Sequence, residues 1–365
     1  MSDEPILPDY GRGGLTGVLA QVAAELVKPT AMGSVKRYVV VLVDGLGWYG
    51  LQAALADAPY LAGIFGDGQR LTSTVPSTTA AAITAFTTGV APGEHGLVGY
   101  RFRWAAGRGM NALTWEGGPD TATGLAETWF QRLTAAGVSV NNIARAKFTD
   151  SGLTKVAFAG ARFIPEAGAQ ARVDQIAALA VAGERSLTYV YELSLDHVGH
   201  AKGSNSAQWR ETLSAIDAFL EQLRDALDSD TALLITGDHG MVDAGQRSRV
   251  VLEDETRLGT DLEQVEGEAR FRHLYTARPR DLAARWAAVL GERAWVQRRE
   301  EAIEQGWFGT VSAAVRPRIG DVVVAMRADG ALLTRQWPGE MKLIGMHGSL
   351  TPAEMYVPLL IDEGK

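Results

Sequence analysis

The chain contains no cysteine among its 365 residues, which excludes disulfide bonds and thiolate metal ligands. Excess positive charge is missing as well: the formal net charge is -8, and no long run of Lys or Arg occurs. A protein that binds nucleic-acid polymers through their phosphates needs a clustered cationic surface. We therefore expect no nucleic-acid polymer among its partners.

Long apolar stretches are also absent. No window reaches the ~18 consecutive apolar residues of a membrane-spanning helix, and the first residues, with Asp3 and Glu4, lack the apolar centre of a secretory signal. We predict a cytoplasmic protein without a membrane partner. Its 46% hydrophobic and 21% charged residues are typical of a globular protein. The oligomeric state stays open.

Buried strands that alternate with helices are the main pattern of the chain. Apolar runs at 38–44, 187–196 and 232–236 predict strands that are buried on both faces. The amphipathic segment 207–228 predicts a helix between the last two of them, and such a succession implies parallel pairing. We therefore predict an α/β fold with a mostly parallel central sheet and helices on both faces. Further strands are expected at 139–144 and 355–361.

The alternation is interrupted late in the chain, where residues 247–330 are more charged. We predict a small inserted α+β lobe over this range, and a hydrolase core formed by residues 1–246 and 331–365. The lobe carries Trp295 and Trp307–Phe308, which we expect to contribute to a substrate wall.

Three aspartates and three histidines fall at or just after predicted strand ends. They are Asp44, Asp196, His200, Asp238, His239 and His347. Because parallel strands end at the same edge of a sheet, these side chains are expected to meet there. Carboxylates with imidazoles suit zinc, manganese or iron, and two metals need about this many ligands. We therefore predict two divalent cations as cofactors.

A candidate nucleophile lies in residues 76–89, where Pro76 and Ser77 predict a helix start. The hydroxyls of Ser77, Thr78 and Thr79 fall at this start, where free N–H groups favour an anion. A hydroxyl bound to a metal can lose its proton near neutral pH and attack phosphorus or sulfur. Ser77 and Thr78 can alternatively act as simple helix caps.

Together these motifs resemble the alkaline phosphatase superfamily, nearest its nucleotide pyrophosphatase/phosphodiesterase branch. The resemblance covers residues 36–100, 187–243 and 344–361, and it implies that Thr79 is the nucleophile. It also implies which residues hold which metal, with zinc as the expected ion. One metal would be held by Asp44, Asp238, His239 and the Thr79 oxygen, and the other by Asp196, His200 and His347.

The resemblance implies a phosphoric ester hydrolase that acts through a phosphothreonine intermediate on a small-molecule phosphate ester or nucleotide. One position departs from the pattern. Phosphodiesterases of this branch carry Asn three residues after the nucleophile, where this chain has Ala82. The polar residues Asn111, Arg145 and Lys147 are candidates to replace it. A phosphomonoesterase or a phosphonate hydrolase of the same superfamily is therefore the alternative.

Two alternatives come from other protein classes. Residues 45–50 match the G-x-G-x-x-G pattern of dinucleotide-binding oxidoreductases directly after a strand, although this leaves the Asp/His set unexplained. A non-catalytic metal-binding protein of the same fold is the second alternative. Of the other histidines, we expect His95 to brace a turn, His197 to support a ligand from behind, and His273 to lie at the surface.

Overall fold

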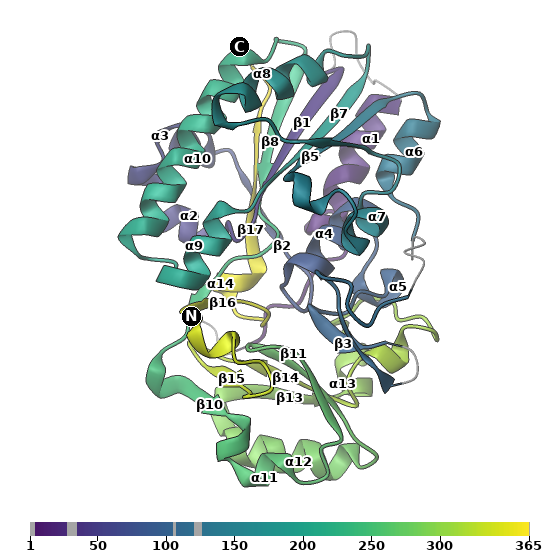
Figure 1. Ribbon diagram of the computed structural model, residues 1–365, viewed down its shortest axis with the longest axis vertical. Helices are drawn as coiled ribbons and strands as arrows, with labels where there is room; N and C mark the ends of the chain where they lie inside the picture. Colours follow the sequence, from purple (N-terminus) through teal and green to yellow (C-terminus); the bar gives the residue numbers. More distant parts are fainter. Residues whose placement is uncertain (1–3, 28–34, 105–106, 120–125, 365) are drawn as a thin grey trace.

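The computed structural model describes residues 4–27, 35–104, 107–119 and 126–364. A seven-stranded sheet with the strand order β2-β17-β8-β1-β7-β5-β6 forms its centre (Figure 1). The middle of the sheet is parallel, because β1 (Arg37–Val43) pairs in parallel with its two neighbours. These neighbours are β7 (Ser186–Glu192) and β8 (Thr231–Thr236).

The outer strands complete a mostly parallel sheet. On one side, β5 (Ser139–Ala144) pairs in parallel with both β7 and β6 (Arg162–Pro165). On the other side, β17 (Tyr356–Asp362) runs antiparallel to β8 and to β2 (Gln69–Thr72). The predicted sheet type is confirmed, and each expected strand lies within a few residues of its predicted position.

Helices cover both faces of this sheet, because apolar side chains of β1 point alternately to the two faces and all need to be buried. Val40 and Leu42 face one hydrophobic cluster, whereas Val39, Val41 and Val43 face the other. Full burial of each such side chain stabilises the fold by about 1.5–3 kcal/mol. The first cluster includes α1 (Val18–Val27), α4 (Thr79–Thr88), α6 (Trp129–Ala135) and α7 (Gly152–Ala157). The second includes α2 (Trp48–Ala53), α3 (Pro59–Phe65), α8 (Ala169–Ala180), α9 (Ser194–Lys202) and α10 (Ala207–Ala226).

A second, antiparallel sheet lies below the first in Figure 1, with the strand order β11-β12-β14-β13. Leu274 and Val324 on one of its faces pack with Trp286 of a helix, whereas Phe271 and Val323 on the other face join the first cluster of the main core. The range 247–330 therefore contains helices and an antiparallel sheet, which packs directly on the core. The elements named here are β11 (Gln264–Glu268), β12 (Phe271–Tyr275), β13 (Ala294–Arg298), β14 (Val322–Met326) and the helix α12 (Pro279–Leu290).

The exact division of the chain into core and lobe stays a prediction. One pairing crosses the expected boundary, because β10 (Arg249–Val251) pairs in parallel with β15 (Ala331–Leu333). Of the described helices, none combines the length and apolar character that a membrane crossing requires. The remaining short elements are β3 (Arg101–Arg103), β4 (Gly109–Asn111), β9 (Val242–Asp243), β16 (Gly345–Met346), α5 (Pro92–His95), α11 (Thr256–Gly259), α13 (Arg299–Glu304) and α14 (Pro352–Met355).

Two glycines after β1 allow close backbone packing. Gly45 has a φ of 76°, and a Cβ atom there would lie 3.1 Å from the Cα of Asp196. A Cβ at Gly47 would lie 2.6 Å from the Cα of Gly240. The glycines at 45 and 47 are thus required by the packing of neighbouring loops, which explains them without a bound dinucleotide.

We expect Gly47→Ala to lower the free energy of unfolding by about 1–3 kcal/mol, because the added methyl overpacks against the loop at Gly240. Gly63→Ala is the matched control: nothing lies within 4 Å of a Cβ there, and alanine in this helical position should stabilise by about 0.5–1 kcal/mol. Urea unfolding measures both. Equal effects of the two substitutions would contradict the packing account.

Candidate metal centre

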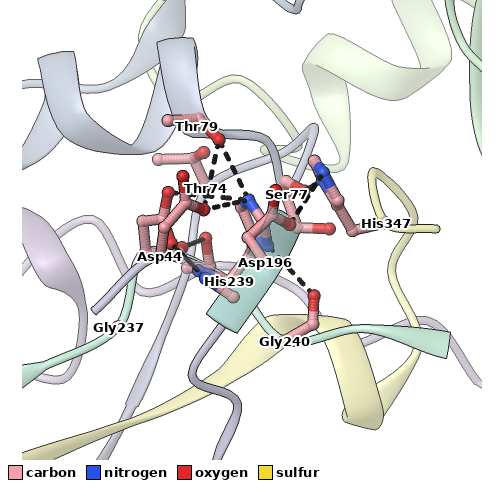
Figure 2. A network of polar contacts seen from close by, with 12 residues as sticks. Asp44, Thr74, Ser77, Thr79, Asp196, Gly237, His239, Gly240 and His347 are labelled. Carbon is pink, nitrogen blue, oxygen red and sulfur yellow. Dashed lines mark hydrogen bonds and ion pairs between the residues drawn. The ribbon is translucent and has the colours of Figure 1, made fainter. Parts of the chain in front are cut away.

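The structure brings the predicted Asp and His side chains together at one edge of the main sheet. Asp44 directly follows β1, Asp238 and His239 follow β8, and these two strands are neighbours. Asp196 and His200 lie on α9, which begins directly after β7, and His347 follows β16. Figure 2 shows Asp44, Asp196, His239 and His347 gathered with Thr79. The expected convergence at the carboxyl ends of the parallel strands is confirmed.

The first part of the centre is built around His239. Its Nε2 atom lies 3.4 Å from Asp44 Oδ1 and 3.5 Å from Asp238 Oδ2. The Thr79 hydroxyl is 3.2 Å from the same Nε2 and 3.5 Å from Asp44 Oδ1. A hydroxyl, an imidazole nitrogen and two carboxylates therefore face one small volume.

The second part of the centre is built around Asp196. His200 Nε2 lies 3.3 Å from Asp196 Oδ2, and His347 Nε2 lies 3.8 Å from Asp196 Oδ1. Asp196 also has a carboxylate oxygen within 4.8 Å of ligand atoms of both Asp44 and His239. It thus belongs to both parts, because the first turn of α9 sets its Cα against Gly45 at the end of β1.

Each of the three histidines is oriented by a backbone carbonyl. In His239, the Nδ1 atom lies 3.0 Å from Gly240 O. The corresponding distances are 2.7 Å to Gly345 O in His200 and 2.9 Å to Ser77 O in His347. Donation of the Nδ1 proton to these carbonyls leaves each Nε2 with a free lone pair that faces the carboxylates. This is the arrangement of imidazoles that bind a metal.

Buried negative charge is the dominant electrostatic feature of the centre. Burial, together with Asp238 and Asp196, raises the pKa of Asp44 well above its ordinary value. Burial raises the pKa of Asp238 as well. Asp196 Oδ1 and Asp238 Oδ2 are buried without a hydrogen-bond partner, and among the described residues no Lys or Arg forms an ion pair with these three aspartates. Divalent cations would supply the missing partners, so the donor set fits them.

Thr79 is the first residue of α4 and is 9% exposed. The alternative role of Ser77 and Thr78 as caps is wrong, because α4 has no side-chain cap. Ser77 Oγ instead donates to Ser349 O at 2.8 Å and accepts from Gly348 N at 3.2 Å. Ser77 therefore ties the nucleophile segment to the loop that carries His347.

A cavity of about 600 Å³ opens onto Asp44, Thr79 and His347, a size typical of small-molecule sites. Sequence reasoning missed several of its lining residues. Tyr191 donates its hydroxyl to Asp44 Oδ2, and burial raises its pKa further above the ordinary value. Asn142 and Glu268 also line the cavity. Asn142 lies near the carboxyl end of β5 and could have been found by the strand-end rule, whereas nothing in the sequence indicates where Glu268 lies.

The residues expected to replace the missing asparagine lie elsewhere. None of Asn111, Arg145 and Lys147 is among the lining residues. Asn111 accepts hydrogen bonds from the backbone of the turn that follows it, Arg145 pairs with Glu166, and Lys147 lies over the ring of Phe148. Polarity alone therefore gave a wrong prediction, because local partners hold these three side chains.

Other expectations also need correction. Trp307 and Phe308 are fully buried in the core and do not line the cavity, and Trp295 does not line it either.

His273 is fully buried, so the predicted surface position of this residue was wrong. Its Nδ1 accepts a hydrogen bond from Gly320 N, and its Nε2 faces Val98 O. His197 is exposed and not buried behind a ligand. His95 does brace a turn: its Nδ1 accepts from Leu97 N.

Comparison with known proteins agrees with this geometry. Residues 38–350 match the family of type I phosphodiesterases / nucleotide pyrophosphatases. The chain belongs to this family. The fold and the resemblance to the alkaline phosphatase superfamily are thereby confirmed, and the dinucleotide-binding alternative has no support.

Solved structures of similar fold have low sequence identity and therefore show the fold alone. One is murine ectonucleotide pyrophosphatase/phosphodiesterase 5, an inactive form in complex with AMP, with a TM-score of 0.70, 17% identity, and coverage of 89% of this chain and 87% of that chain. Another is phosphonoacetate hydrolase of Sinorhizobium meliloti in complex with phosphonoformate, with a TM-score of 0.69, 19% identity, and coverage of 90% of each chain.

Curated relatives match over short segments. GPI ethanolamine phosphate transferase 3 of Eremothecium gossypii is 45% identical over 53 residues, which are 14% of this chain and 5% of that protein. The catalytic subunit of human GPI ethanolamine phosphate transferase 2 is 28% identical over 120 residues, 30% of this chain and 12% of that protein. The chain thus spans only a small part of the length of these relatives.

We expect Asp238→Asn to raise the melting temperature of the metal-free protein, because it removes a buried negative charge whose Oδ2 atom has no hydrogen-bond partner among the described residues. With its pKa raised in the fold, the Asp238 carboxyl makes its full contribution to stability below its ordinary pKa of 3.8, and this contribution is lost as pH rises through the raised pKa. The stability advantage of Asp238→Asn over the wild type should therefore grow as the pH rises from the ordinary pKa to the raised one.

The same substitution should reverse its effect when metal is added. Zinc at a hundredfold excess over its dissociation constant stabilises a protein by about 3 kcal/mol, and the variant should lose most of this gain. Thermal unfolding with a chelator and with zinc measures both effects. A variant that is less stable than the wild type under both conditions would show that Asp238 is only structural.

Proposed function

We propose that the chain is a metal-dependent phosphodiesterase in which Thr79 is the nucleophile. The observation that carries this proposal is the position of the Thr79 hydroxyl, which faces His239 Nε2 and Asp44 Oδ1 at the cavity. Asp44, Asp238, His239 and Thr79 would hold one divalent cation, and Asp196, His200 and His347 would hold the other. Zinc is the proposed ion, with manganese or iron as alternatives.

The residues of the chain would do the following work. Thr79 Oγ1 loses its proton to solvent and attacks phosphorus in line, so that a bond from Oγ1 to phosphorus forms while the bond to the leaving alcohol oxygen breaks. The alcohol oxygen takes up a proton, and water then attacks the phosphothreonine, which restores the Thr79 hydroxyl and releases a phosphate monoester. When bound, the cations would supply Lewis acidity that lowers the pKa of the hydroxyl and offsets charge on the phosphoryl oxygens.

Ala82 offers no polar side chain to bind a phosphoryl oxygen. Backbone N–H groups at the start of α4 would take this role, which supports the proposal. The first N–H groups of a helix have no partner within it, and Thr78 makes no side-chain cap. These N–H groups are therefore available to a phosphoryl oxygen beside Thr79, which is the kind of stabilisation that transition-state charge requires.

A phosphonate hydrolase or phosphomonoesterase is the alternative function, and the similar fold of phosphonoacetate hydrolase supports keeping it. We propose a small-molecule phosphate ester or nucleotide as the substrate. Cytoplasmic location and the absence of membrane or nucleic-acid partners remain predictions.

We expect Thr79→Ala to reduce hydrolysis of bis(4-nitrophenyl) phosphate by at least about a thousandfold, because the covalent step is lost. The metal content of the protein should stay close to that of the wild type, since the other ligands remain. Chromogenic assays and elemental analysis test the two statements. Retained turnover in the Thr79→Ala variant would refute the nucleophile assignment.

His200→Ala should remove one of two cations per chain, because His200 is part of only the second group. We expect the cation near His239 to remain, so the metal content should fall by about half. His197→Ala, which changes an exposed histidine of the same helix, is the control and should keep the full content. Unchanged metal in His200→Ala would show that it is not a ligand.

A further inference from the structure

Glu268 is a buried carboxyl group in the cavity that no step of the proposed reaction uses. It is the last residue of β11, it is 7% exposed, and it lines the cavity together with Thr79. Its Oε2 accepts a hydrogen bond from Tyr100 N at 3.3 Å. Its Oε1 is buried and has no hydrogen-bond partner in the described part of the chain. Among the described residues, no Lys or Arg forms an ion pair with this carboxyl group.

Two contacts hold Glu268 next to the metal centre. Its carboxyl group contacts the side chain of Thr78, which directly precedes Thr79. A Cβ atom at Gly348, where φ is 128°, would lie 2.6 Å from Glu268 Cγ, so the glutamate stem packs against the residue that follows His347. The carboxyl group is thus placed beside both the nucleophile and a candidate ligand.

Glu266 offers a direct comparison, because alternate residues of a strand share a face. It lies two residues earlier on β11 and is also buried, at 2% exposure. Its carboxylate is paired with Arg101 at 3.2 Å and accepts from Gln264 at 2.8 Å. The neighbouring buried acid on this face is therefore paired within the protein, whereas Glu268 lines the cavity and forms no ion pair with a described Lys or Arg.

Apart from the proposed metal cations, the described residues of the cavity provide no positive charge that could bind a second anion. Among the described residues that line it, none is Lys or Arg. A further acid of the cavity, Glu340, is paired with Arg272, which does not itself line the cavity. The aromatic residues Tyr100 and Trp337 belong to the remaining wall. A substrate with a further carboxylate or phosphate would meet Glu268 without a compensating cation.

We propose, on the basis of the proposed function, that Glu268 determines substrate specificity: its carboxyl group accepts a hydrogen bond from a hydroxyl or ammonium group on the ester arm, and it disfavours substrates with a second anionic group. Burial raises the pKa of the Glu268 carboxyl to about 8, so an ammonium group bound beside it would favour the carboxylate form, whereas a second anion there would disfavour that form. This substrate class differs from phosphonoacetate, which carries a carboxylate beside its phosphonate.

Binding to the zinc-loaded Thr79→Ala variant tests this inference without turnover. The ligands are four phenyl phosphodiesters whose second arm is methyl, 2-hydroxyethyl, 2-aminoethyl or carboxymethyl, and calorimetry measures their affinities. We expect the hydroxyethyl or the aminoethyl ester to bind about tenfold to a hundredfold more tightly than the methyl ester, and the carboxymethyl ester to bind most weakly. Equal affinities, or no binding of any of them, would overturn the proposal.

Substitutions at Glu268 in the same Thr79→Ala background identify the group responsible. Glu268→Leu should abolish the preference while leaving the affinity for the methyl ester within about threefold. Glu268→Gln should keep a preference for a hydroxyl and lose one for an ammonium group, which distinguishes the two donors. Glu266→Gln is the matched control and should keep the full preference. A preference that survives in Glu268→Leu would refute the role of this residue.

The proposed function can fail independently of this result. If wild-type protein hydrolyses none of the four esters but the Thr79→Ala variant shows the expected order of affinities, the specificity inference holds and the catalytic assignment is wrong. If the wild type hydrolyses all four at equal kcat/KM, the catalytic assignment holds and the inference is wrong.

Discussion

The repulsion among three carboxylates at one edge of the sheet is the constraint on which the rest of the site depends. Asp44, Asp196 and Asp238 meet beyond the ends of three adjacent strands, and burial raises the pKa values of Asp44 and Asp238 there. A fold that keeps such an arrangement is less stable without cations than one with neutral groups there. The imidazole of His347 does not relieve this repulsion as a cation, because burial and the neighbouring His239 and His200 lower the pKa of His347 well below its ordinary value.

The parallel sheet creates this concentration of charge. Strands β8, β1 and β7 are neighbours, so the residues that follow them are adjacent although they lie far apart in the sequence. Gly45 and Gly47 then let the loops approach until backbone atoms touch. Backbone carbonyls complete the arrangement by orienting three imidazoles toward the carboxylates. Strand ends, one helix and backbone contacts between loops therefore position the candidate ligands together.

Part of this site could be predicted from the sequence, for a physical reason. Residues directly after buried parallel strands must share an edge, so the positions of Asp44 and Asp238 follow from local pattern alone. The position of Glu268 depends on how the second sheet packs on the first, which no local pattern encodes. His273 and Trp307 were misplaced for the same reason, because they are buried between the second sheet and the core.

Membership in the phosphodiesterase family leaves the substrate open, because related folds bind AMP in one case and phosphonoformate in another. The chemistry common to such proteins would come from the metal centre, and selectivity would come from the wall that the second sheet contributes. The central claim is therefore the dinuclear centre itself. Anomalous diffraction from crystals grown with zinc tests it most directly. The account predicts two peaks about 3.5–4 Å apart, one beside His239 and one beside His200 and His347. A single peak, or peaks away from these histidines, would contradict it.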